Sequence, residues 1–140
     1  MFGKILLAVD GSEHALLSAR MAGDLARTMK AETVRIIVVY NNIPSYLGEP
    51  NLQAAIDARL QEANTILAAA IKALGEVSAE IHTEIIEGSP AEAIIEVAEV
   101  RKVDVIVMGS RGMSRLAGLL LGSNSQKVVS HAPCPVLVVR

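Results

Sequence analysis

The chain has 140 residues, 51% of them apolar, and a formal net charge of −2. A chain of this length fits one domain and can bury roughly two thirds of the surface that its unfolded form exposes. The near-neutral charge, without any block of like charges, argues against a surface for nucleic acid or for an anionic membrane. No apolar run is long enough to cross a bilayer, so we expect a cytoplasmic protein that forms a single domain over residues 1–140.

Strands and helices are expected to alternate along the sequence. Short aliphatic runs, typical of strands buried on both faces, alternate with segments whose apolar residues recur every three to four positions, as in amphipathic helices. In chain order we expect a strand at 4–9, a helix from 12 to about 30, a strand at 34–40, an exposed loop at 41–50, a long helix at 52–74, a strand at 79–87, a helix from 89 to about 101, a strand at 103–108, a helix from about 122 to 131 and a strand at 136–139. This alternation predicts a parallel sheet with helices on both faces, joined by right-handed crossovers.

Local signals mark where some of these elements begin. Ser12 is expected to be the N-cap of the first helix. Ser89, Pro90 and Glu92 predict a capping box at the third helix, in which the Glu92 side chain reaches back to the N-cap residue. The strand at 79–87 alternates apolar and polar residues, which is typical of an edge strand with one wet face.

The segment from 103 to 125 carries the strongest functional signal. A buried strand ends at Met108, and glycines and hydroxyl residues follow it: Gly109, Gly112, Gly122, Ser123 and Ser125. Glycine lets backbone N–H groups approach an oxyanion closely, and the positive end of a helix that begins here would face the same anion. The spacing matches neither the P-loop nor the dinucleotide fingerprint. A purely structural interpretation, with turn glycines and a serine N-cap, stays open from these residues alone.

In this pattern the sequence resembles the universal stress protein family, in its ATP-binding branch. Three segments match in the right order: ILLAVDGS, which ends the first strand at Asp10; Gly109 and Gly112, then nine residues, then Gly122-Ser123; and PCPVLVVR at the end. The resemblance covers the whole chain. It implies a doubly wound, Rossmann-like five-stranded sheet of order 3-2-1-4-5. Strands one and four would then meet at the switch point where such sheets bind ligands.

The resemblance also implies a nucleotide site. Asp10 would accept a hydrogen bond from a ribose hydroxyl or help to hold a divalent cation, although its residue type also fits an Asx-turn or an N-cap. Val39 matches a position whose backbone recognises adenine, and Met108 a position beside the base. The residues matching phosphate and ribose contacts are Gly109, Gly112, Gly122, Ser123, Asn124 and Ser125. Arg111 could meet phosphate by charge. Asn124 departs from the small aliphatic residue common in the family, at a position that contributes mainly its backbone N–H.

No residue pattern indicates a dedicated catalyst. His14, His82 and His131 lack metal-ligand spacing and nucleophile–base partners, so we expect them to be bystanders. No lysine stands at a P-loop position, and no residue pair suggests a general base for a γ-phosphate. The lone cysteine, Cys134, excludes an internal disulfide and is expected to be a packed small residue. Lys127, just beyond the glycine loop, is expected to be solvated.

The sequence therefore predicts an ATP-binding module for stress response or regulation, with Mg²⁺ or Mn²⁺ on the phosphates and at most slow hydrolysis. Three alternatives stay open: a nucleotide-free dimeric interaction protein, as in a family branch without the glycine signature; a binder of AMP or a cyclic nucleotide; and a true ATPase or nucleotidyl-transfer enzyme. In the family the last strand pairs with that of a second copy, which implies a homodimer through Val136–Val139.

Overall fold

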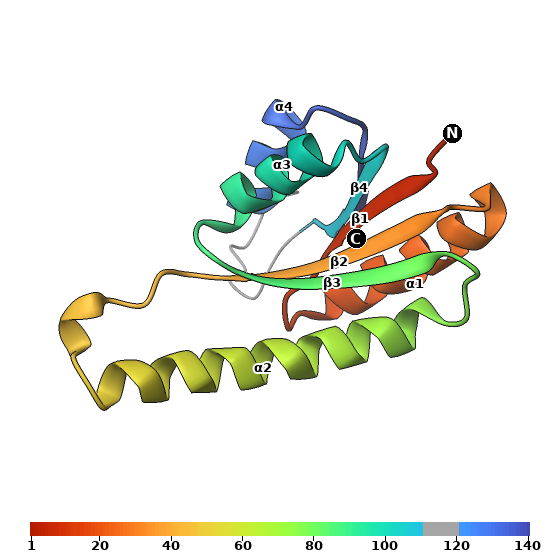
Figure 1. The fold of residues 1–140 in the computed structure, drawn as a ribbon. Helices are drawn as coiled ribbons and strands as arrows, with labels where there is room; N and C mark the ends of the chain where they lie inside the picture. The colour runs from red at the N-terminus through yellow and green to blue at the C-terminus, as the bar shows by residue number, and fades with distance from the viewer. Residues whose placement is uncertain (111–120) are drawn as a thin grey trace.

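The computed structural model describes residues 1–110 and 121–140 (Figure 1). The elements of these residues are β1 (Lys4–Ala8), α1 (Glu13–Met29), β2 (Thr33–Tyr40), the 3-10 helix η1 (Ser45–Leu47), α2 (Asn51–Leu74), β3 (Glu80–Glu87), α3 (Pro90–Arg101), β4 (Val105–Gly109), α4 (Ser123–His131) and β5 (Val136–Val139). The five strands form one parallel sheet of order β3-β2-β1-β4-β5. The predicted doubly wound fold and its strand order are confirmed.

The sheet is covered on both faces, which explains the unbroken apolar runs of its central strands. Ile5 and Leu7 of β1 pack into a core with α1 and α2, whereas Leu6, between them, packs into a second core with α3 and α4. All three side chains are buried. Because successive strand residues point to opposite faces, each position of a central strand must be apolar. Figure 1 shows the two helix layers on either side of the sheet.

Helix α1 begins and ends where its sequence provides caps. The Ser12 hydroxyl accepts a hydrogen bond from the Ala15 N–H at 3.2 Å, so the predicted N-cap is confirmed. Lys30 ends the helix in a left-handed conformation, with φ of 53°. The face toward the core consists of small residues, among them Ala19 and Ala22. This small-residue face lets α1 lie close to both the sheet and α2.

The capping box predicted at α3 is wrong in its side chains. Ser89 is the N-cap residue and Pro90 opens the helix, but the Ser89 side chain makes no capping hydrogen bond. Glu92 does not reach back. Its Oε1 instead accepts a hydrogen bond at 3.0 Å from Nζ of Lys127 on α4, because α4 packs beside α3. A contact between residues 35 positions apart thus replaces the local one.

The two edges of the sheet are β3 and β5. On the predicted wet face of β3, Glu84 accepts a hydrogen bond at 2.6 Å from Arg35 of β2. Cys134, just before β5, is half-buried, and burial, followed by the charge of Asp104, raises the pKa of its thiol. This environment agrees with a packed, unreactive thiol. No helix within the described ranges is long and apolar enough to span a membrane.

Candidate functional site

The site is built where the winding of the sheet reverses. β1 and β4 lie side by side, with Ile5 opposite Val105 and Leu7 opposite Val107. α1, which follows β1, packs on one face, and α4, which comes after β4, packs on the other. Asp10, just after the carboxyl end of β1, and Gly109, at the carboxyl end of β4, therefore flank one crevice although they are far apart in sequence. Ligands of open α/β sheets bind at this position.

Two connected hollows open at this edge. A small inner pocket of about 100 Å³ is lined by apolar residues of β1, β2, β4 and α3, including Ala8, Val39 and Met108. A larger cleft of about 540 Å³ extends outward past the end of β2 to α2 and the start of α4. The residues that line both hollows are Asp10, Val39, Pro90, Asn124 and Ser125. The cleft has the volume of typical small-molecule sites, which is about 300–1,000 Å³.

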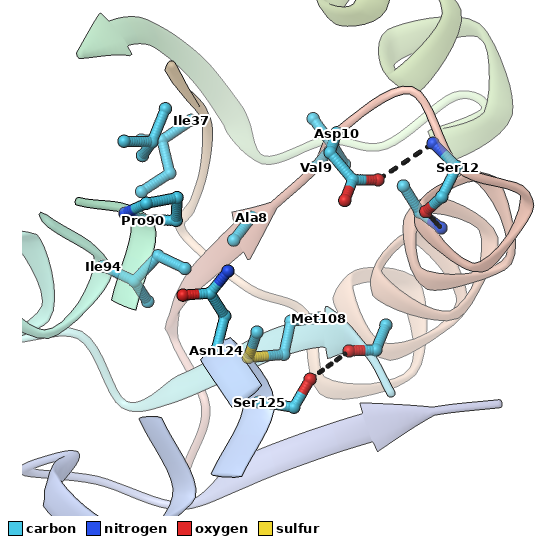
Figure 2. A pocket seen from close by; sticks show the side chains of 13 residues that line it. Ala8, Val9, Asp10, Ser12, Ile37, Pro90, Ile94, Met108, Asn124 and Ser125 are labelled. Atoms are coloured by element: carbon cyan, nitrogen blue, oxygen red, sulfur yellow. Dashed lines mark hydrogen bonds between the residues drawn. The ribbon is translucent and has the colours of Figure 1, made fainter. Parts of the chain in front are cut away.

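Asp10 forms an Asx-turn, which was one of the structural roles that its residue type allowed. Its Oδ1 accepts a hydrogen bond from the Ser12 N–H at 2.9 Å, which fixes an Asx-turn before α1 (Figure 2). The residue is half-buried, and it lines both hollows. The Asx-turn therefore orients the carboxylate at the rim of the cleft and leaves a ligand role compatible with it.

The first turn of α4 forms the opposite wall. Its N-cap is Gly122, which has no side chain to satisfy the first N–H groups of the helix. Ser123 and Asn124 are exposed, and both line the cleft. The first N–H groups of a helix have no partner within it and carry the positive end of its dipole. This wall therefore has backbone donors of the kind that suit an anion.

Ser125 has a different environment from the one that its sequence position suggests. The residue is 2% exposed, and its hydroxyl lies 2.9 Å from the carbonyl oxygens of both Gly109 and Ser110. The hydroxyl thus ties α4 to the end of β4, and the backbone is the part of Ser125 that remains available to a ligand. Figure 2 shows the Asn124 amide pointing across the inner pocket toward Ala8, so this side chain, which departs from the family pattern, narrows that pocket.

Several predicted positions are brought together, and two lie outside the described residues. Val39, at the end of β2, and Met108, at the end of β4, line the inner pocket with Gly109. Arg111 and Gly112 lie outside the described residues. Lys127 points to Glu92 on α3 and lines neither hollow.

The sequence reasoning missed three features of this region. Arg59 of α2 is the only cation that the described residues contribute to the cleft wall, and it lies 3.5 Å from Glu62. Tyr40 closes the end of β2, where burial, then the charge of Glu87 and the hydrogen bond to it, raises the pKa of the phenol. His14, expected to be a bystander, has its Nδ1 2.9 Å from the buried Ser110 hydroxyl.

No group of three or more His, Cys, Asp or Glu residues in the described ranges could hold a metal ion. A cation in this cleft would therefore need ligands beyond the protein, such as phosphate oxygens. Asp10 and Glu62 are the carboxylates that line the larger cleft.

A parallel five-stranded sheet with helices on both faces, and a cleft at its switch point, defines the class of doubly wound α/β proteins. Residues 1–140 match the universal stress protein family, and the chain belongs to it. A universal stress protein of Thermus aquaticus is 45% identical, with both chains fully covered.

Solved structures agree with this assignment. UspA from Lactobacillus plantarum has a TM-score of 0.87 and 28% identity, covering 99% of this chain and 98% of its own. A universal stress protein in complex with cAMP has a TM-score of 0.69 and 28% identity, covering 98% of this chain and 96% of its own.

Proposed function

We propose that this universal stress protein is a cytoplasmic module for stress response or regulation that binds ATP, together with Mg²⁺ or Mn²⁺, in the cleft at the switch point. The observation that carries the proposal is the uncapped first turn of α4 opposite Asp10. The first N–H groups of α4, which have no partner within the helix, favour phosphate, and the apolar inner pocket beside Val39 and Met108 suits a purine ring. The structural similarity to a family member in complex with cAMP supports an adenine nucleotide as ligand.

Under this proposal the protein binds and does not act as a dedicated catalyst. The backbone N–H groups of Ser123, Asn124 and Ser125 bind phosphate, joined by Gly109 and by the Arg111–Gly112 part of the signature. Asp10 binds a ribose hydroxyl or shares a cation with the phosphates. Such a cation would take most of its ligands from phosphate oxygens and water, as Mg²⁺ often does. We expect hydrolysis, where it occurs, to be slow, because no residue pair of the sequence suggests a general base for a γ-phosphate.

A second candidate ligand is AMP or a cyclic nucleotide. The comparison with the cAMP complex favours it, because that ligand carries a single phosphate. All of these candidate ligands carry the same adenine base, which would occupy the inner pocket of about 100 Å³. The number of phosphates is therefore decided at the outer cleft and not at the base.

The direct test is to identify the nucleotide that co-purifies with the protein by mass spectrometry, and to measure the affinities for ATP, AMP and cAMP by titration calorimetry with and without Mg²⁺. We expect ATP with Mg²⁺ to bind most tightly. Gly122→Leu should abolish binding, because the leucine side chain would stand over the N–H groups of α4, while circular dichroism and the unfolding midpoint show an intact sheet.

Two results would overturn the proposal. One is a nucleotide-free wild-type protein with no measurable heat for any adenine nucleotide, which would favour the alternative of a nucleotide-free dimeric interaction protein. The other is an undiminished affinity of a folded Gly122→Leu variant. A preference for AMP or cAMP over ATP would move the assignment to the second candidate ligand.

A further inference from the structure

The buried polar residues of the described chain form one group beside and behind the cleft. In the described part of the chain, the buried polar residues are Ser18, Ser110 and Ser125, each at most 2% exposed. All three lie in one hydrogen-bonded group with His14. A buried hydroxyl without a partner is costly, so such a cluster is retained only when its members satisfy one another. Apolar packing does not explain why these hydroxyl groups are buried here, so the cluster needs another physical explanation.

Ser110 is the centre of this group, because each of its polar groups binds a different element. Its hydroxyl lies 2.9 Å from Nδ1 of His14 on α1. Its N–H donates to the Val139 carbonyl of β5 at 2.8 Å, and its carbonyl accepts from the Gly122 N–H at 2.6 Å and from the Ser125 hydroxyl at 2.9 Å. One residue at the end of β4 thus joins α1, β5 and the N-terminus of α4.

The two residues of the link to α1 lie behind the cleft and not in it. Neither His14 nor Ser110 lines the inner pocket or the larger cleft. Both stand directly behind residues that do: His14 is in the first turn of α1, just after the Asp10–Ser12 turn, and Ser110 holds Ser125. This chain of contacts thus connects the two polar walls, Asp10 and the first turn of α4.

We propose that His14 and Ser110 are positioning residues of the nucleotide site: their hydrogen bond fixes the Asp10 corner relative to the N–H groups of α4, and so sets nucleotide affinity without touching the ligand. The inference rests on the proposed function, because it assumes that these two walls grip one nucleotide. Binding sites lose much of their affinity when supporting contacts let the contacting groups drift, even though those groups remain present.

Four variants isolate the link. Ser110→Ala and His14→Leu each remove the α1–β4 hydrogen bond and leave the backbone bonds of Ser110 intact. His14→Asn is the conservative rescue, since an Asn side chain can place a polar atom near the position of Nδ1. Ser18→Ala is the matched control: Ser18 is also buried, but its hydroxyl binds the His14 carbonyl at 2.7 Å, a contact within α1.

We expect Ser110→Ala and His14→Leu to weaken ATP binding by about fivefold to tenfold, and Ser18→Ala and His14→Asn by less than about twofold, at matched unfolding stability. The variant that combines Ser110→Ala and His14→Leu should bind ATP no more weakly than the single variant with the lower affinity, because both changes break the same hydrogen bond. Equal affinity of Ser110→Ala, His14→Leu and the wild type, or equal losses in Ser18→Ala, would overturn the inference.

A readout without ligand separates this inference from the proposed function. The Gly122 N–H binds the Ser110 carbonyl, and the Gln126 N–H binds the Gly122 carbonyl at 3.0 Å. Amide hydrogen exchange at Gly122 and Gln126 should be faster in His14→Leu and unchanged in Ser18→Ala. If the wild type binds no nucleotide, the proposed function fails, and the role of the His14–Ser110 link in nucleotide affinity fails with it. Unchanged exchange in His14→Leu shows separately that the link does not hold α4.

Discussion

At the scale of single residues, Asp10 combines a structural bond with an expected ligand contact. One carboxylate oxygen accepts the Ser12 N–H, and the residue also lines the cleft opposite α4. The turn needs only a side-chain oxygen acceptor, whereas a cation needs the negative charge. These two requirements can be separated by an isosteric substitution.

Asp10→Asn keeps the Oδ1 acceptor and removes the charge. If Asp10 shares a cation with the nucleotide, the affinity for Mg–ATP should fall roughly fivefold to tenfold, while the affinity for ATP in EDTA should rise, because a negative charge no longer faces the triphosphate. Calorimetry under the two conditions measures both. The matched control is Asp104→Asn, at the opposite end of the sheet, where the carboxylate accepts the Lys4 N–H.

The two ligand roles of Asp10 predict different patterns. An equal loss with and without Mg²⁺ would assign Asp10 to a ribose hydroxyl instead of a cation. Unchanged affinity in both conditions would remove Asp10 from the site.

The candidate site shows what a sequence reveals about single residues. Asp10, Val39, Met108, Gly109 and the first residues of α4 end or follow strands or open a helix, so their place at the cleft edge was readable from position and from family resemblance. His14 was not, because a histidine near a helix start has no distinctive pattern. Its one signal was Ser18, a polar residue on the core-facing stripe of α1, four positions along the helix.

At the scale of elements, α1 closely approaches the end of α2 at Gly23. A Cβ added at Gly23 would lie 2.0 Å from the Leu74 carbonyl oxygen. The same carbonyl accepts a hydrogen bond from Arg27 at 2.9 Å, and Arg27 also binds the Glu76 carbonyl at 3.0 Å. Glycine at position 23 thus lets α1 approach and cap the C-terminus of α2.

Gly23→Ala should therefore destabilise the protein by about 1–3 kcal/mol, although alanine alone would favour a helix interior by about 1 kcal/mol. Urea unfolding followed by circular dichroism measures the change. Gly3→Ala is the control, since its Cβ would meet no atom closer than 3.7 Å. A Gly23→Ala variant as stable as the wild type would show that α2 shifts freely and that the contact is not close-packed.

Features of the elements were predicted correctly where neighbouring residues determine them, and incorrectly where a residue distant in sequence determines them. Ser12, Pro90 and Gly122 mark helix starts through backbone preferences that act locally. The capping box failed because Lys127 of α4 takes the carboxylate of Glu92. Likewise, periodicity predicts a parallel sheet, but the pairing of β1 with β4 depends on contacts across the whole chain, and only the family resemblance supplied that strand order.

At the scale of the whole molecule, the open edge of β5 is where a second copy would bind. β4 is the strand paired with β5 in the described sheet. The carbonyls of Pro135 and Val139 accept hydrogen bonds from β4, so alternation along the strand directs the backbone groups of Val136 and Val138 outward. An apolar edge with unpaired backbone groups favours pairing with another strand.

We therefore expect a homodimer through Val136–Val139, and sedimentation velocity at micromolar concentration should show it. Val138→Pro removes one outward N–H while leaving the bonds to β4, and edge strands tolerate proline. It should convert the dimer to a folded monomer, whereas Val138→Thr, which keeps the N–H and the β-branched shape, should remain dimeric. A monomeric wild type would contradict the expected dimer, and a dimeric Val138→Pro variant would place its interface elsewhere.

Because β5 also binds Ser110 through Val139, loss of the partner strand should slightly weaken nucleotide binding, and calorimetry on the two variants tests that coupling.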